Sequence, residues 1–84
     1  MYQYIFRSHA EKQIKKLPRN VIIRIKEKLR YFITSPNPLN FASQLKNSAL
    51  GSYRFRIGDY RVIFDLEDEH LIVLAVGHRK EVYK

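Results

Sequence analysis

Aromatic residues recur at every second position at the start of the chain. Tyr2, Tyr4 and Phe6 alternate with non-aromatic residues, which is the two-residue period of a β-strand whose side chains point alternately to its two faces. We therefore predict an N-terminal strand with one aromatic face.

Two amphipathic helices are predicted after this strand. Ser8 followed three residues later by Glu11 is the pattern of a capping box, and the helix that it opens is expected to run to about Leu17. Pro18 disfavours helix at the residue before it and can open a second helix from about Arg19. The apolar stripes are formed by Ala10, Ile14 and Leu17 in the first helix and by Ile22, Ile25, Leu29 and Phe32 in the second.

A loop that contains Pro36 and Pro38, and that is expected to continue irregularly to Leu45, separates the helices from a three-stranded β-meander. The strands are predicted at 52–57, 60–66 and 70–79. Gly58-Asp59 has the Gly-X signature of a two-residue type II′ turn, which sets the register of the first hairpin. This register pairs Ile57 with Tyr60, Arg56 with Arg61, Phe55 with Val62 and Arg54 with Ile63.

The facing of the third strand depends on the loop before it, because the strand is nearly all apolar. A three-residue loop over 67–69 places Ile72, Leu74, Val76 and His78 on the face of Tyr53, Phe55, Ile57, Tyr60, Val62 and Phe64, which the helices can cover. The same loop places Val73, Ala75, Gly77 and Arg79 on the face of Arg54, Arg56 and Arg61. A two-residue loop reverses this facing. We prefer the three-residue loop because it directs the bulkier side chains inward.

These elements predict an α+β fold and a compact single domain over residues 1–84, with the order β-α-α-β-β-β and two N-terminal helices packed on one face of an antiparallel β-meander sheet. The chain has no Cys, which excludes disulfides, thiolate catalysis and Cys-ligated zinc. The longest apolar run, 71–77, is too short to span a membrane, and the N-terminus does not resemble a secretion signal. We therefore expect a cytoplasmic protein without a membrane partner.

The charge is unevenly distributed along the chain. Lys and Arg number 16 against 8 Asp and Glu, which gives a formal net charge of +8. Residues 1–45 hold nine basic and two acidic residues, whereas residues 46–84 hold seven basic and six acidic residues. The helical half is therefore expected to attract an anionic partner. Its basic residues, which form either a solvated face or a surface that steers the protein toward nucleic acid, are Lys12, Lys15, Lys16, Arg19, Arg24 and Lys28.

The arginines of the meander indicate anion-binding chemistry. Arg56 is expected directly opposite Arg61, and like charges in this position are destabilising, so an anionic ligand should offset their repulsion. One arginine on an exposed strand usually serves solubility, but Arg54, Arg56, Arg61 and, in the preferred register, Arg79 converge on one face. Guanidinium groups suit bidentate contacts with phosphate, and the chain has no Gly-rich phosphate-binding loop. We therefore expect a phosphodiester backbone as the ligand.

Two residues near the C-terminus can move protons. Histidine side chains exchange protons near neutral pH, and Tyr83 can donate or accept a proton beside cations. His78 points inward in the preferred register and joins the arginines in the alternative one. His9 and His70 lack the spacing of metal ligands, so we expect neither a metal nor another cofactor.

Three segments resemble the RelE/ParE superfamily of bacterial and archaeal type II toxins. They are Leu17-Pro18, the hairpin Tyr-Arg-Phe-Arg-Ile-Gly-Asp-Tyr-Arg over 53–61 with its flanks from Gly51 to Phe64, and the closing Gly77-His78-Arg79-Lys80-Glu81-Val82-Tyr83. The resemblance covers almost the whole chain, and the order β-α-α-β-β-β matches that family's fold. It implies a ribosome-dependent endoribonuclease, an mRNA interferase, as the toxin component of a type II toxin-antitoxin system.

The resemblance also implies how such a toxin acts. It enters the ribosomal A site, contacts mRNA and 16S rRNA, and cleaves the codon there. The nucleophile is the 2′-hydroxyl of the RNA itself, which gives a cyclic phosphate and a 5′-hydroxyl without a metal. A cognate antitoxin wraps such toxins and holds them inactive.

Roles carry over to residues that match the family's motif. Arg54 and Arg56 match two positions that are lysines in well-known members, one of which is assigned proton transfer. Because a guanidinium hardly deprotonates, Arg54 is better suited to clamp the RNA or to activate the 2′-hydroxyl, and the general base stays unassigned. Arg61 and Arg79 match phosphate-binding arginines that should stabilise the charge of the transition state. Tyr83 matches the C-terminal tyrosine that stacks on the RNA base and orients the site.

His78 matches a position that is often basic in relatives, and it could protonate the 5′-oxygen only in the alternative register. Two other functions stay open. A ParE-like toxin poisons DNA gyrase and cleaves nothing, but such relatives typically lack the full basic set with a tyrosine. A degenerate member would retain only antitoxin or nucleic-acid binding. An antitoxin with an acidic segment and apolar anchors would suit the basic helices and the margins of the sheet.

Overall fold

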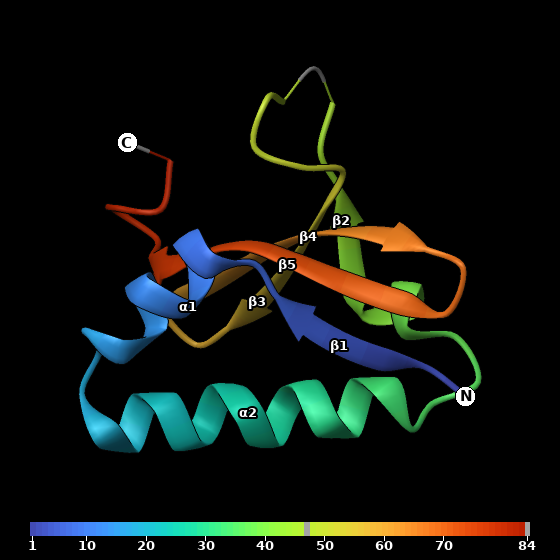
Figure 1. Ribbon diagram of the computed structural model, residues 1–84, viewed down its shortest axis with the longest axis horizontal. Helices are drawn as coiled ribbons and strands as arrows, with labels where there is room; N and C mark the ends of the chain where they lie inside the picture. The colour runs from blue at the N-terminus through green and yellow to red at the C-terminus, as the bar shows by residue number, and fades with distance from the viewer. Residues whose placement is uncertain (47, 84) are drawn as a thin grey trace.

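The computed structural model describes residues 1–46 and 48–83, which form a five-stranded sheet with two α-helices (Figure 1). The strands are β1 (Gln3–Phe6), β2 (Ala42–Gln44), β3 (Tyr53–Ile57), β4 (Tyr60–Glu67) and β5 (His70–His78); the helices are α1 (Ser8–Lys15) and α2 (Arg19–Ile33), and a 3-10 helix (Pro38–Phe41) precedes β2. The strand order is β1-β5-β4-β3-β2, with β1 parallel to β5 and the other neighbours antiparallel. The predicted α+β fold is confirmed, and the structure adds the short strand β2.

The two helices begin where the backbone leaves an extended conformation. The predicted capping box at Ser8 is wrong, because Arg7 is the N-cap and makes no side-chain capping bond. The N–H of Arg7 still donates to the carbonyl of Val73 in β5, at 2.9 Å, so strand pairing ends only one residue before the helix. Pro18 is the N-cap of α2, which begins at Arg19 as predicted. Neither helix, within the described residues, is long and apolar enough to cross a membrane.

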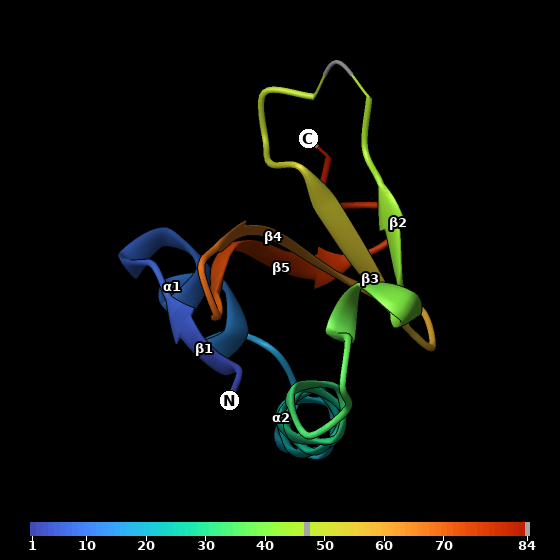
Figure 2. The same cartoon turned by 90° about the vertical axis from the view of Figure 1, so that its right-hand side faces the viewer.

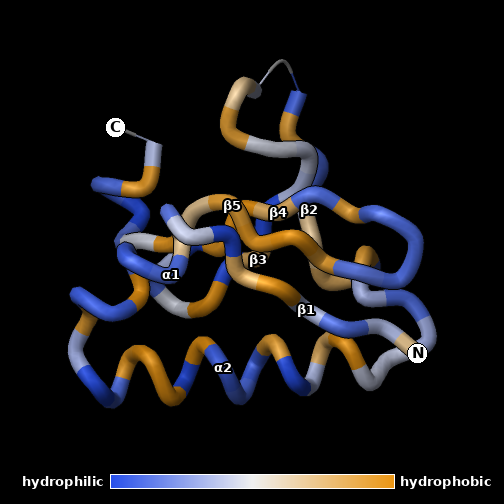
Figure 3. The backbone as a smooth tube through the Cα atoms, viewed as in Figure 1, coloured by the Kyte–Doolittle hydropathy of each residue, from blue (hydrophilic) through white to orange (hydrophobic). Residues whose placement is uncertain are grey.

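The core lies between the two helices and one face of the sheet. Ile25, Leu29 and Phe32 of α2 are buried. Hydrophobic and hydrophilic segments alternate along α2 in Figure 3. The ring of Phe32 lies 4.4 Å from the ring of Phe55 in β3, which lies 4.4 Å from that of Phe64 in β4. Aromatic contacts of this kind add to the free energy gained from area burial. We call this side of the sheet the helix face.

The predicted facing of β5 is half right. His78 and Val76 pair with Tyr60 and Val62 on the helix face, and Gly77 pairs with Arg61 on the opposite face, as expected. Ile72, Leu74 and Val73 were placed wrongly. Val73 belongs to the core on the helix face, Ile72 pairs with Asp65 on the other face, and Leu74 approaches Gly51 there.

Two irregularities account for these errors. Glu67 pairs with His70, so the loop before β5 has two residues rather than three, and its first residue, Asp68, has a φ of 56°. The register then shifts by one residue at Leu74, where β5 bulges against Ile63 and Phe64. A bulge inserts one unpaired residue and reverses the facing of everything beyond it. The bulge therefore undoes the effect of the shorter loop for the C-terminal half of β5.

The opposite face of the sheet is covered only in part. Figures 1 and 2 show α2 on one side of the sheet, and residues 48–52 and the C-terminal segment 79–83 on the other. Because Arg54, Arg56 and Arg61 belong to this second side by their register, we call it the arginine face.

Candidate functional site

The β3–β4 hairpin places three arginines on the arginine face. Gly58 has a φ of 59°, a left-handed conformation that glycine adopts without strain, and it opens the two-residue turn predicted from Gly58-Asp59. Arg56 pairs with Arg61, so the predicted register of this hairpin is confirmed. Two guanidinium groups therefore start from directly opposite positions on neighbouring strands.

Arg61 is the buried member of this set, with 7% of its surface exposed. Its Nη1 donates hydrogen bonds to the carbonyl oxygens of Gly58 and Tyr60, each at 2.9 Å. These bonds hold the guanidinium against the turn that precedes it. A buried charge is costly unless it is paired, and in the part of the chain that the structure describes no carboxylate lies within ion-pair distance of Arg61.

The surroundings of Arg61 show which groups converge. Burial lowers the pKa of the Arg61 guanidinium, and the positive charges of Arg56, Arg54 and Arg79 lower that pKa further, whereas Tyr83 raises it. An arginine keeps its charge at neutral pH despite such shifts. Arg54, Arg56, Arg79 and Tyr83 are therefore all close enough to Arg61 to affect its pKa.

Arg54 and Tyr83 make the direct contact within this group. The Nη1 of Arg54 donates a hydrogen bond to the hydroxyl oxygen of Tyr83 at 2.9 Å. The Nε of Arg54 is buried and has no hydrogen-bond partner among the described residues. Such buried donors are rare in folded proteins. An acceptor supplied by a ligand would satisfy this donor.

The C-terminal segment reaches Arg54 because it turns back over the arginine face. The N–H groups of Glu81 and Val82 donate to the carbonyl of His78 at 2.8 and 2.9 Å, which closes a tight turn directly after β5. Val82 is 3% exposed and packs with Ile63 and Ala75. Sequence reasoning gave Val82 no role, although one valine among five charged or aromatic neighbours was a signal for an apolar anchor.

Gly77 leaves the room that Val82 occupies. A Cβ added to Gly77 would lie 3.5 Å from both the Cα and the Cβ of Val82. That separation is ordinary contact, so alanine would fit, but a larger side chain would take the place of Val82. The small residue opposite Arg61 thus allows the segment that carries Tyr83 to lie close to the sheet.

Arg79 connects the same segment to the β3–β4 turn. Its backbone N–H donates to the carbonyl of Asp59 at 2.8 Å, and its Nε lies 3.9 Å from the Asp59 carboxylate. Both side chains are more than half exposed, so this ion pair is weak. Arg79 therefore remains free to meet an anionic ligand.

His78 is not brought to the arginines. Its ring lies 5.5 Å from that of Tyr60, edge to face, and its Nδ1 accepts a hydrogen bond from the N–H of Lys80 at 3.1 Å. Tyr60 packs against the core on the helix face. The structure thus has the inward orientation of the preferred register at this residue. Among residues 1–46 and 48–83, no three His, Asp or Glu side chains gather into a group that could hold a metal ion.

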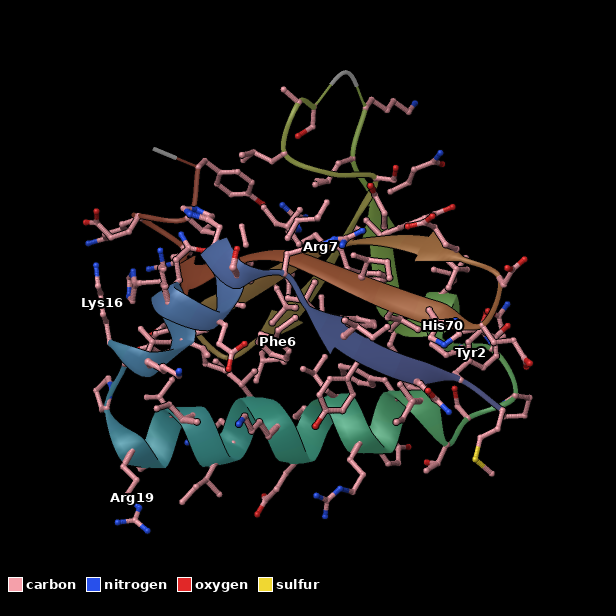
Figure 4. The ribbon with its side chains drawn as sticks, in the orientation of Figure 1. Tyr2, Phe6, Arg7, Lys16, Arg19 and His70 are labelled. Carbon is pink, nitrogen blue, oxygen red and sulfur yellow. The ribbon has the colours of Figure 1, made fainter. Side chains whose placement is uncertain are left out.

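The basic helix residues are spread over a different surface. Lys12, Lys15, Lys16, Arg19, Arg24 and Lys28 are all exposed. Lys15 pairs with Glu11 at 3.7 Å, and the Nζ of Lys28 lies 5.9 Å from the centre of the Tyr31 ring. Lys16 and Arg19 extend into solvent at the junction of the helices (Figure 4). Arg24 differs, because its Nη1 would lie 3.3 Å from a Cβ at Gly58 in the hairpin turn.

Leu45 and Ser52 are held beside the arginine face by hydrogen bonds. Asp65 accepts a hydrogen bond from the N–H of Ser52 at 2.8 Å, and the N–H of Leu45 donates to the carbonyl of Ser52 at 2.8 Å. Leu45 packs against the small cluster around Val82.

Two surface cavities of about 400 and 340 Å³ lie elsewhere. One lies between the start of β1 and the loop after α2, and the other lies between β1, α1 and α2. Neither of these two cavities is lined by the hairpin arginines or by Tyr83.

Comparison with known proteins shows the family of the chain. Residues 4–83 match the family described as the ParE toxin of the type II toxin-antitoxin system parDE. The toxin RelG of Mycobacterium tuberculosis is 28% identical over 99% of this chain and 97% of its own length. The RelBE2 toxin-antitoxin complex of M. tuberculosis contains a chain with a TM-score of 0.78 and 26% identity, over 93% of this chain and 98% of that one.

A second solved toxin-antitoxin complex also contains a chain of similar fold. The intact RelBE toxin-antitoxin complex of Escherichia coli contains a chain with a TM-score of 0.72 and 26% identity, over 93% of this chain and 96% of that one. The family match covers nearly every residue, including the hairpin arginines and Tyr83. The chain belongs to the RelE/ParE superfamily of toxins from type II toxin-antitoxin systems.

Proposed function

We propose that this toxin is a RelE-type endoribonuclease, which acts in the cytoplasm and cleaves mRNA in the A site of the ribosome. The observation that carries the proposal is the convergence of Arg54, Arg56, Arg61, Arg79 and Tyr83 on one face of the sheet. Four guanidinium groups, with no carboxylate of the described residues within ion-pair distance of Arg61, suit a phosphodiester whose charge increases during the reaction.

The reaction is a transesterification within the RNA. The 2′-oxygen attacks the adjacent phosphorus and loses its proton, the bond from phosphorus to the 5′-oxygen breaks, and the 5′-oxygen gains a proton. The products are a 2′,3′-cyclic phosphate and a 5′-hydroxyl. Arg61 and Arg79 stabilise the additional negative charge on the phosphoryl oxygens in this proposal.

In this proposal Tyr83 takes part in proton transfer, and Arg54 orients its hydroxyl. Because Arg54 donates to the oxygen of Tyr83, the phenolic proton of Tyr83 points toward another acceptor. Tyr83 is 46% exposed, so its ring is also accessible for stacking on an RNA base. Arg54 keeps its proton and stabilises charge, as expected of a guanidinium.

We also propose that a cognate antitoxin holds the toxin inactive. The solved complexes of RelBE from M. tuberculosis and E. coli are toxin-antitoxin complexes, and this chain matches their toxin fold. A partner with acidic segments suits the formal net charge of +8. An adjacent reading frame for a short acidic protein is the observation that would support this partner most directly.

Primer extension on a translated message tests the nuclease. Wild-type toxin should produce cuts at the codon in the A site, and the double variant Arg61→Ala, Arg79→Ala should produce none. Since Arg61 also supports the turn, the exposed variant Arg56→Gln is measured beside it, with a thermal unfolding curve for each protein. Growth arrest by the wild type without any cleavage of mRNA would end the proposal.

A ParE-like gyrase poison is the second candidate, and the description of the matching family favours it. Such a toxin would induce the DNA-damage response and leave mRNA intact. The full arginine set with Tyr83 supports the nuclease instead. A gyrase supercoiling assay with the purified toxin separates the two activities.

A further inference from the structure

We propose that the β3–β4 turn is a second phosphate-binding position, which holds a backbone phosphate of the same single-stranded RNA that lies on the arginine face. This inference rests on the proposed function, because it extends the ligand of that site. The turn consists of Gly58 and Asp59 and stands at the end of the sheet where β5 leads into the C-terminal segment.

Guanidinium groups from three parts of the chain surround this turn. Arg24 comes from α2, and its Nη1 would lie 3.3 Å from a Cβ at Gly58. Arg61 comes from β4, and its Nη1 donates to the carbonyl of Gly58 at 2.9 Å. Arg79 follows β5, and its backbone N–H donates to the carbonyl of Asp59 at 2.8 Å. The turn thus gathers cations that are 18 to 55 positions apart in the sequence.

The protein balances only part of the positive charge around the turn. Asp59 is the acidic residue of the turn, and its carboxylate lies 3.9 Å from the Nε of Arg79 with both side chains largely exposed. In the described residues, no carboxylate lies within ion-pair distance of Arg24. A phosphate placed here would offset the mutual repulsion of the guanidinium groups, as would a phosphate on the arginine face.

Gly58 keeps this position open. Its φ of 59° favours glycine for conformational reasons. A methyl group at Gly58 would lie 3.3 Å from the Nη1 of the flexible Arg24 side chain and would occupy part of the space beside the turn. Without a side chain, a phosphate oxygen can approach both the backbone and Arg24.

Arg61 belongs to the arginine face and also contacts the turn, so it connects the two proposed phosphate positions. One of its nitrogens is bonded to the turn, and its charge is also felt by Arg56 and Arg54. A ligand that spans both positions must therefore present successive phosphates along one strand. Single-stranded RNA does so, whereas a mononucleotide offers only one end. Arg24 then acts as a specific contact, not as part of a diffuse steering surface.

The test measures how the affinity for a single strand depends on salt. The probe is a fluorescein-labelled oligonucleotide of deoxyuridine, which lacks the 2′-hydroxyl and is not cleaved, and binding is followed by fluorescence anisotropy. Each phosphate contact contributes a slope of about −0.7 to log K against log salt for single strands. Arg24→Gln should therefore reduce the magnitude of the slope by about 0.7 and weaken binding at low salt.

Arg30→Gln is the matched control, since Arg30 is another exposed arginine of α2 and lies in its last turn. It should keep the wild-type slope. Equal slopes for Arg24→Gln and Arg30→Gln would overturn the inference, and a reduced slope for Arg24→Gln alone would support it. Arg56→Gln distinguishes the two proposals. If Arg56→Gln reduces the magnitude of the slope and Arg24→Gln does not, only the phosphate position at the turn is refuted. If both variants bind the probe as the wild type does, RNA binding by the arginine face is refuted as well.

A competitor with a single phosphate gives a second readout. In competition with the probe, a deoxyuridine dinucleotide should bind wild type and Arg24→Gln with the same affinity, because it fills only the arginine face. A dinucleotide affinity that falls with Arg24→Gln would place Arg24 at the arginine face itself and would overturn the separate position.

Discussion

Replacing Arg56 by Gln is expected to stabilise the fold while it weakens the proposed site. Arg56 faces Arg61 across the hairpin, and Arg61 is 7% exposed, so salt and water screen this repulsion incompletely. Like charges directly opposite on neighbouring strands cost about 0.2–1 kcal/mol. For a chain of 84 residues, a gain of about 0.5 kcal/mol corresponds to a rise of roughly 2–4 °C in Tm.

Arg30→Gln provides a control of opposite sign. Arg30 lies in the last turn of α2, where a positive charge interacts favourably with the negative end of the helix dipole by about 0.3–1 kcal/mol. The same chemical change is therefore expected to lower Tm by a few degrees at this position. Both differences should shrink as salt is raised, because both are electrostatic.

Thermal unfolding followed by circular dichroism at low and at high salt measures these effects, and anisotropy with the oligonucleotide probe measures binding. A more stable variant that binds RNA less well is the pattern expected of a residue retained for a ligand rather than for the fold. A fall in the Tm of Arg56→Gln similar to that of Arg30→Gln would refute the electrostatic reasoning, and wild-type binding would refute its link to the site.

Three further substitutions test other parts of the structure. Gly51→Ala should lower the free energy of unfolding in urea by about 1–3 kcal/mol, because its Cβ would lie 2.8 Å from Cγ2 of Ile63, whereas Gly77→Ala meets nothing closer than 3.5 Å; equal stability of the two variants would contradict this. Tyr83→Phe removes the hydroxyl that accepts a hydrogen bond from β3, so cleavage in primer extension should fall at an unchanged Tm, and full activity would exclude a proton role. His78→Gln should keep wild-type cleavage, since the ring lies on the helix face. A large loss of cleavage activity would instead show that His78 takes part in the reaction.

The arginine face could be predicted because local chemistry determines it. A two-residue turn that starts with glycine sets the register of both strands, and the side-chain period of two then assigns every residue of β3 and β4 to a face. Arg54, Arg56 and Arg61 follow from Gly58-Asp59 alone. The hydrogen bond from Arg54 to Tyr83 does not, because it joins residues 29 positions apart and depends on how the C-terminal segment folds back.

Elements that depend on neighbours were harder to predict. Strand β2 reads Ala-Ser-Gln, which has no strand pattern of its own, and it is a strand because it pairs with β3. The parallel pairing of β1 with β5 likewise comes from the tertiary fold. At Ser8, strand pairing by Arg7 took precedence over a local capping pattern.

The bulge in β5 is the feature on which the site depends most and which the sequence signals least. Leu74 is an ordinary apolar residue in an apolar strand, yet if Leu74 were paired in a regular register instead of bulging, a two-residue loop would turn Gly77 to the helix face and His78 to the arginine face. Val82 would then lose the space that Gly77 leaves, and the segment with Tyr83 would not reach Arg54. The bulge compensates for the short loop and so maintains the site.

Deleting Leu74 tests this reasoning directly. The deletion removes the unpaired residue, so Val73 can keep its pairing with Phe64 and Ala75 its pairing with Ile63, and both halves of β5 retain their facing. We expect a folded protein that has lost the contacts of one partly buried leucine, about 1–3 kcal/mol, and that still binds the oligonucleotide probe. Deleting Val62 from β4 is the control. Val62 is paired with both neighbouring strands, so its deletion shifts the register of β4 against β3 and β5, and the variant should unfold. A Leu74 deletion that unfolds, or that folds without binding the probe, would show that the bulged geometry itself and not the facing of Gly77 maintains the site.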